Sequence, residues 1–187
     1  PELARNPLPA AGFIAQHLPD IAPACVPPGT PAVLTLCSLH GGDAFNVIPE
    51  QVTLTGTARA FDEDLLARMH TRLADLADRA ARAHGVDARL DWVLGTPPVL
   101  NDAACCERLR QALLAVGADP ARIIRTPPVL GAEDFAWISR EVPACYFFLG
   151  TGDPAQEVGA SWHSPRFRMN ESVLPQAAAA FAHLALA

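Results

Sequence analysis

The 187-residue sequence contains no lysine, and all fourteen of its basic residues are arginines. Twenty aspartates and glutamates outnumber them, which gives a formal net charge of -6 and a pI near 5.4. An acidic chain of this kind is not expected to bind nucleic acid or an anionic membrane as its main partner. The absence of lysine, together with abundant alanine and proline, is typical of a GC-rich bacterial genome and carries no functional signal.

The sequence also lacks the patterns of several common protein classes. No apolar run reaches the roughly 18 residues needed to span a bilayer, and no signal peptide is visible. The five cysteines form an odd, scattered set without a C-x-x-C pair, which excludes a zinc ribbon or a thioredoxin motif and favours free thiols in a reducing cytoplasm. No G-x-S-x-G, Walker, Rossmann or H-E-x-x-H pattern occurs either.

Regular periodicity is present in the first 95 residues. Residues 51–61 alternate between small or apolar side chains and threonine or arginine, which predicts a half-buried antiparallel strand. Apolar residues recur every three or four positions over 62–85, which predicts a long helix ending at a glycine. The other elements expected here are a helix over 7–22 and strands over 32–39 and 86–94. This order indicates a small α+β sandwich.

A second unit begins with the segment TPPVLND, which starts at Thr96. It alternates helical and apolar patterns and has no internal repeat. The expected elements are helices over 103–117, 131–142 and 170–187, and strands over 121–126 and 143–150. The run 143–150 is continuously apolar, as in a strand buried on both faces.

His163 is the first residue that could carry chemistry. It lies between a tryptophan and a Ser-Pro pair, in a loop that follows the buried strand and precedes the last helix. Loops at strand ends are where α/β enzymes place their ligands. The imidazole could therefore be a metal ligand or a structural hydrogen-bonding group, and position alone favours neither.

Three more residues have both a structural and a functional interpretation. Glu133, in the segment GAEDF, lies near a helix N-terminus, where an acid is favoured by roughly 0.3–1 kcal/mol without any further role. Asn46 fits a turn, and Arg59 fits a solvated strand face. An arginine fork together with an amide would nevertheless suit a substrate carboxylate. Nothing local activates a cysteine nucleophile.

Three segments, taken in order, carry a resemblance: GGDAFNVIPEQVTLTGTARAFD, GAEDFAWI and WHSPRFRMNESVLP. This ordered set resembles the metal-dependent amidohydrolases of the M20 peptidase family, nearest the hippurate hydrolases and the hydrolases of indole-acetyl amino acids. Such enzymes have an α/β catalytic domain with a two-metal site and an inserted lid that also forms the dimer interface. The resemblance implies an α+β fold. Residues 1–94 would form the lid (dimerisation) domain, an α/β sandwich with an antiparallel sheet that is incomplete at its N-terminus. Residues 95–187 would form the C-terminal portion of the α/β catalytic domain.

The same resemblance implies roles for individual residues. His163 matches a metal ligand, and Asn46 and Arg59, thirteen positions apart, match a pair that holds the substrate carboxylate. Glu133 falls in an acidic motif at the rim of the active site and is placed among the substrate-binding residues, with its role open. The family's other metal-binding segments and its general base precede the position of Pro1, so no catalytic base is expected in this chain.

The expected function is therefore part of a metal-dependent amidohydrolase, an aminoacylase-type peptidase that cleaves the amide bond of N-acyl amino acids or small peptides. A complete site would hold two divalent metals, zinc or manganese, with cobalt or nickel as alternatives. The chain alone is expected to lack them and to be inactive. Its expected partners are a second copy, through the lid, and the missing N-terminal half. A non-catalytic dimerisation or ligand-binding module of the same fold is the alternative, and a cysteine hydrolase is a weaker third.

Overall fold

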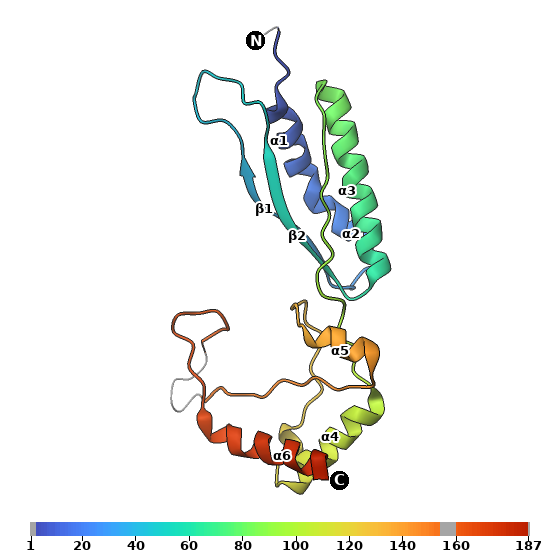
Figure 1. Ribbon diagram of the computed structural model, residues 1–187, viewed down its shortest axis with the longest axis vertical. Coiled ribbons are helices and arrows are strands. Elements are labelled where there is room, and N and C mark those ends of the chain that lie inside the picture. Colours follow the sequence, from blue (N-terminus) through green and yellow to red (C-terminus); the bar gives the residue numbers. More distant parts are fainter. Residues whose placement is uncertain (1–2, 154–159, 187) are drawn as a thin grey trace. The chain divides into compact units, whose positions relative to one another are not determined.

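The computed structural model describes residues 3–153 and 160–186, and the chain divides into two compact units (Figure 1). The first unit consists of Pro1–Pro98 with Val129–Ala132, and the second of Val99–Pro128 with Glu133–Ala187. No helix among the described residues has both the length and the apolar character needed to span a bilayer.

The first unit contains four helical segments and a hairpin. They are α1 (Pro7–His17), the 3-10 helix η1 (Leu18–Asp20), α2 (Ile21–Cys25), β1 (Ala32–His40), β2 (Thr53–Ala60) and α3 (Glu63–His84). The single helix expected over 7–22 is thus divided. Pro19, in the first turn of η1, lacks an N–H, and its ring clashes with the carbonyl four residues earlier, so a continuous α-helix is interrupted there.

The two strands pair in antiparallel register from Ala32 opposite Ala60 to His40 opposite Thr53. The register shifts between Leu36 and Ser38, so that β1 carries one extra residue opposite Gly56. A Cβ atom at Gly56 would collide with the carbonyl oxygen of Thr35 on the partner strand. This position therefore requires glycine for the two strands to stay in contact.

One face of the hairpin is covered by α1, α2 and α3, as Figure 1 shows. Leu34 from β1 and Met69 and Leu73 from α3 are buried in a common cluster, against which Ala58 and Ala60 of β2 also pack. Asp62 caps the start of α3, because its side chain accepts a hydrogen bond from the backbone of the second residue of the helix, and Gly85, with φ 64°, caps its end. The helix and its C-terminal cap are as predicted.

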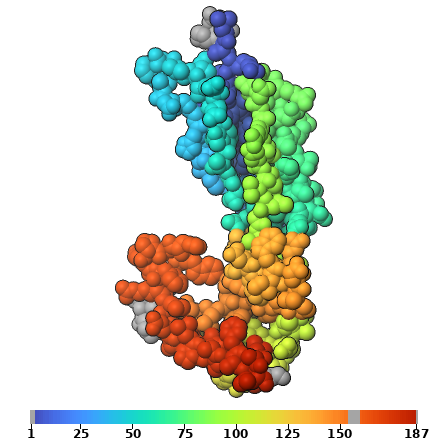
Figure 2. Space-filling model, in the orientation of Figure 1, coloured from blue at the N-terminus to red at the C-terminus, as the bar shows by residue number. Residues whose placement is uncertain are grey.

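The strand expected over 86–94 is absent from the described residues, where this segment is extended but unpaired. Leu90 and Trp92 pack against the core cluster, and the Trp92 ring lies 5.1 Å from that of His70 on α3. Figure 2 shows the segment lying along the surface of the first unit. The segment thus contacts the core through these side chains, but a strand also needs a neighbouring backbone to pair with, which periodicity does not reveal.

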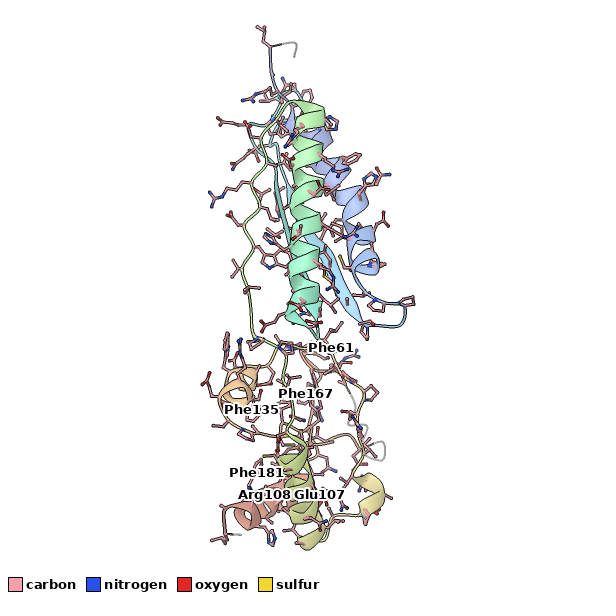
Figure 3. All side chains as sticks on the ribbon, turned by 90° about the vertical axis from the view of Figure 1, so that its right-hand side faces the viewer. Phe61, Glu107, Arg108, Phe135, Phe167 and Phe181 are labelled. Carbon is pink, nitrogen blue, oxygen red and sulfur yellow. The ribbon has the colours of Figure 1, made fainter. Side chains whose placement is uncertain are left out.

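The second unit is built mainly of helices. They are α4 (Ala103–Ala115), the 3-10 helix η2 (Pro120–Arg122), α5 (Phe135–Glu141), the 3-10 helix η4 (Glu171–Val173) and α6 (Leu174–Leu186). Helices α4 and α6 pack together. Figure 3 labels Phe181 on α6, whose ring lies 5.8 Å from that of Phe147.

The strands expected over 121–126 and 143–150 are also absent from the described residues. Asp119 caps η2 by accepting a hydrogen bond from the backbone of Ala121, which turns the start of the first segment into a 3-10 helix. In the second segment the side chain of Asn101 takes the place of a neighbouring strand. Its Nδ2 donates to the Tyr146 carbonyl and its Oδ1 accepts from the Tyr146 N–H, both at 2.8 Å.

Candidate active site

His163 lies at the third position of a turn that is closed by a 3.1 Å hydrogen bond from Ser164 N–H to Ser161 O. Its φ is 64°, and among residues 3–153 and 160–186 no other non-glycine residue has a positive φ. A side chain in this left-handed conformation costs roughly 1–2 kcal/mol, and such strain is concentrated at functional sites. A second turn follows directly, because Phe167 N–H donates to Ser164 O at 3.0 Å.

The His163 ring is exposed and has no hydrogen-bond partner in the described part of the chain. It lines an open hollow of about 650 Å³ together with Phe148, Thr151, Trp162 and Arg168. The structural interpretation of His163, as a residue that bonds the loop backbone, is therefore not supported by any contact of its ring. The imidazole is available for a ligand.

The described residues do not form a complete metal centre. Nowhere in 3–153 or 160–186 do three or more histidine, cysteine, aspartate or glutamate side chains come close enough to hold a metal ion. A catalytic zinc site takes about three protein ligands and leaves one position open. His163 therefore offers a single imidazole, and a two-metal site does not fit the described residues by themselves.

Glu133 is more than a capping residue at the start of α5. One carboxylate oxygen accepts the Phe135 N–H at 3.2 Å, while the other accepts the hydroxyl of Tyr146 at 2.8 Å. This hydrogen bond to a half-buried carboxylate, followed by burial, raises the pKa of the Tyr146 phenol. The structure thus joins the acidic motif to the extended segment that precedes the His163 loop.

Tyr146 was not selected from the sequence. A signal existed, because a hydroxyl within the apolar run 143–150 needs a hydrogen-bond partner once it is buried. Its ring lies 5.6 Å from Phe135, labelled in Figure 3 at the start of α5, and 5.5 Å from Phe148. Phe148 in turn lies 5.4 Å from Trp162. A continuous row of aromatic rings therefore connects the neighbourhood of Glu133 to the turn that carries His163.

Asn46 and Arg59 both belong to the first unit, but they lie at opposite ends of the hairpin. Arg59 pairs with Val33 near the open end of the sheet, six residues from Thr53, or about 20 Å along an extended strand. Asn46 is an exposed turn residue in the loop that joins the two strands at the other end. Figure 1 shows this loop beyond the ends of β1 and β2.

The loop continues the hairpin outward, since Gly42 and Pro49 face each other across it. Asn46 therefore lies even farther from Arg59 than the end of β2 does. Because Ala58 and Ala60 pack against the core, Arg59 projects from the opposite face of the hairpin, where it is half-buried. One copy of the chain does not bring the amide and the guanidinium to the same carboxylate.

Tyr146 is the only tyrosine of the chain, so absorbance of its phenolate reports one group. We expect it to titrate above the ordinary pKa of about 10, because Glu133 accepts the phenol proton and its charge repels the phenolate. Glu133→Gln should lower this pKa towards the ordinary value, whereas Glu141→Gln, at the exposed end of α5, should leave it unchanged. An unaltered pKa in Glu133→Gln would contradict the assigned hydrogen bond.

The raised pKa also fixes the direction of a stability effect. A phenol whose pKa is higher in the folded state contributes stability that is fully present below its unfolded pKa. That contribution is lost as the pH rises through the folded pKa. Alkaline unfolding should therefore begin at lower pH in wild type than in a Tyr146→Phe variant, relative to the neutral stability of each protein.

Comparisons with known proteins agree with the fold. The family model described as Peptidase family M20/M25/M40 matches residues 11–187. The sequence is 31% identical to "IAA-amino acid hydrolase ILR1-like 4" of Arabidopsis thaliana, over 99% of this chain and 43% of that protein. It is 30% identical to "N-acetyl-L-cysteine deacetylase" of Bacillus subtilis, over 92% of this chain and 39% of that protein.

Among solved structures, the chain is similar to the YXEP protein of Bacillus subtilis, described as a dinuclear metal binding peptidase. The TM-score is 0.80 at 26% identity, covering 99% of this chain and 46% of that one. The chain thus spans less than half the length of the relatives it matches. Since the family model covers all but the first ten residues, the chain belongs to peptidase family M20/M25/M40.

Proposed function

We propose that this chain is part of a metal-dependent amidohydrolase that cleaves the amide bond of N-acyl amino acids or small peptides in a bacterial cytoplasm. Family membership supports the reaction class. Two relatives support the substrate class, because their names describe hydrolysis of an IAA-amino acid and deacetylation of N-acetyl-L-cysteine. The single observation in this chain that carries the proposal is His163, whose imidazole is exposed and whose backbone is strained.

In this proposal His163 supplies one ligand to a divalent metal. The other ligands and the general base come from the part of the relatives' length that this chain does not span. One imidazole suits zinc, manganese, cobalt and nickel alike, so the ligand type leaves the choice among these metals open. The chain alone would then neither hold the metals tightly nor turn over substrate.

The two units have different proposed roles. The first unit, with its hairpin covered by helices, would be the lid and the site of dimerisation, and the second would be part of the catalytic domain. Large apolar side chains of the second unit support this assignment. Leu100, Ile124 and Phe181 are 73%, 72% and 58% exposed. Apolar surface of this kind is usually covered by further protein.

Arg59 is proposed to bind the free carboxylate of the substrate, which its planar fork can hold with two hydrogen bonds. Asn46 would have to reach the same carboxylate from a second copy, because the hairpin separates the two residues within one chain. The proposed dimer is therefore part of substrate binding and not only of assembly.

The proposed activity is tested on the complete protein with N-acetyl amino acids as substrates. We expect hydrolysis that a chelator abolishes and that added zinc or manganese restores. The 187-residue chain by itself should show no hydrolysis and no tight metal binding in a calorimetric titration. Full activity after metal removal would contradict the proposed reaction. Stoichiometric, tight metal binding by the chain alone would contradict the proposal that the other metal ligands lie outside this chain.

Arg59→Ala in the complete protein should raise KM for substrates with a free carboxylate by roughly 10- to 100-fold, since a hydrogen bond to a charged group contributes about 1.5–3 kcal/mol. Substrates in which the carboxylate is replaced by an amide should be affected much less. Arg72→Ala, at an exposed position of α3, is the matched control. Equal losses for both kinds of substrate would contradict the assigned contact.

A further inference from the structure

Two cysteines from different segments of the second unit lie in direct contact. The Cys106 thiol, in the first turns of α4, donates to the Cys145 sulfur at an Sγ–Sγ distance of 3.3 Å. Both residues are half-buried, and both are free thiols. Glu107, the next residue of α4, is labelled in Figure 3. The proposed hydrolysis gives this pair of cysteines no role.

The backbone around the two cysteines is held by hydrogen bonds on both sides. Asp102 caps α4 by accepting the Cys105 N–H at 2.9 Å, and its own N–H donates to the Ala144 carbonyl at 2.8 Å. Asn101 binds both backbone groups of Tyr146 at 2.8 Å. Hydrogen bonds therefore join Asn101 and Asp102, at the start of α4, to the two residues that flank Cys145. The surrounding backbone thus holds the two sulfurs in contact.

A disulfide bond is about 2.05 Å long, so the two sulfurs need to approach by only about 1 Å. Cys105, although adjacent in sequence, makes no hydrogen bond to either sulfur among the described residues. Burial, and then the hydrogen bond from Cys106, raises the pKa of Cys145 to about 12. Its thiol is therefore protonated and weakly nucleophilic at neutral pH.

We propose that Cys106 and Cys145 are a redox-sensitive modification site that closes to a reversible disulfide when the protein meets a low-molecular-weight disulfide. A thiolate of the pair attacks one sulfur of the oxidant, forms a mixed disulfide and releases one small thiol. The second cysteine then gives up its proton, attacks the first cysteine's sulfur and releases the other small thiol. Two cysteine thiols are oxidised, and one small disulfide is reduced to two thiols.

A disulfide between Cys106 and Cys145 would affect the structure near Glu133. Cys145 directly precedes Tyr146, whose hydroxyl holds Glu133. The disulfide would fix α4 to the segment that supports this carboxylate. Disulfides of intracellular proteins are usually transient and redox-sensing, which fits the cytoplasmic location proposed above.

The test is peptide mapping of the protein after equilibration with reduced and oxidised glutathione. Free thiols are blocked under denaturing conditions, and the chain is then cut after arginine. Cys105 and Cys106 fall in the peptide 90–108, and Cys145 falls in the peptide 141–166. We expect these two peptides to be linked, to separate on reduction, and to account for the loss of two free thiols.

Serine variants show which of the two adjacent cysteines forms the bond with Cys145. Cys105→Ser should keep the link and Cys106→Ser should abolish it, while circular dichroism confirms that both variants remain helical. A link that persists in Cys106→Ser would overturn the assignment. The proposal also fails if the wild-type protein forms no link at a glutathione ratio that oxidises the exposed Cys37 to a mixed disulfide. Neither result depends on metal or on hydrolytic activity, so the outcome is independent of the proposed function.

Discussion

Replacing His163 by alanine in the complete protein should lower the metal content and the rate of amide hydrolysis together. Mutation of groups that merely orient metal ligands costs about 10–100-fold in affinity or activity, so loss of a direct ligand should reduce kcat/KM by at least about 100-fold. The measurements are metal per protomer by elemental analysis and kcat/KM for one N-acetyl amino acid. The expectation follows from an exposed imidazole that has no partner among the described residues.

The strained backbone at this position allows a sharper version of the experiment. Glycine adopts φ 64° without the cost that a side chain carries. His163→Gly should therefore fold at least as well as wild type yet lose metal as fully as His163→Ala. His84→Ala, at an exposed histidine of α3, is the matched control and should keep both metal and activity. Unchanged metal stoichiometry in both His163 variants would contradict the ligand assignment.

The elements that could be predicted from the sequence are those whose signals are local. Helix α3 has apolar residues at helical spacing, an aspartate cap and a terminal glycine, and the structure places it at Glu63–His84. Strand β1, expected over 32–39, occupies Ala32–His40. In both cases the residues that fix the element lie within it or next to it, so no knowledge of distant partners is needed.

The predictions of three strands that are absent from the described residues were wrong for the opposite reason, because a strand depends on distant partners. The segments 86–94, 121–126 and 143–150 have strand-like composition, but a strand exists only where another backbone pairs with it. In 143–150 the partner is the side chain of Asn101, 45 residues from Tyr146. A single asparagine in a turn-like segment gives no sign in the sequence of such a long-range role.

The candidate site shows the same difference between local features, which the sequence predicts, and long-range contacts, which it does not. The candidate metal ligand and the three candidate substrate-binding residues were selected from the sequence, but Tyr146 and the spatial relations of all five residues were not. The bond between Glu133 and Tyr146 spans 13 positions, and the contact between Cys106 and Cys145 spans 39. Residue type and the resemblance assigned Asn46 and Arg59 to one substrate carboxylate, and nothing in the sequence indicated that the hairpin register puts the two residues at opposite ends.

Met69→Ala should cause the largest loss of stability of any single truncation in the first unit. Met69 is 0% exposed and is the largest fully buried side chain among the described residues. It packs in the cluster formed by α3, the N-terminal helical segments and β1, so its removal leaves a cavity that all three must enclose. Truncations of this kind lower the free energy of unfolding by about 2–5 kcal/mol.

Denaturant unfolding followed by circular dichroism measures this loss, and the chain offers a matched control in its only other methionine. Met169 is 41% exposed, so Met169→Ala should change stability by less than about 1 kcal/mol. Met69→Leu, which nearly conserves volume, should cost under about 1.5 kcal/mol. If Met69→Ala were no more destabilising than Met169→Ala, the cluster would not be the core of the first unit. The packing that holds Ala58 and Ala60 inward, and thereby turns Arg59 outward, would then need another explanation.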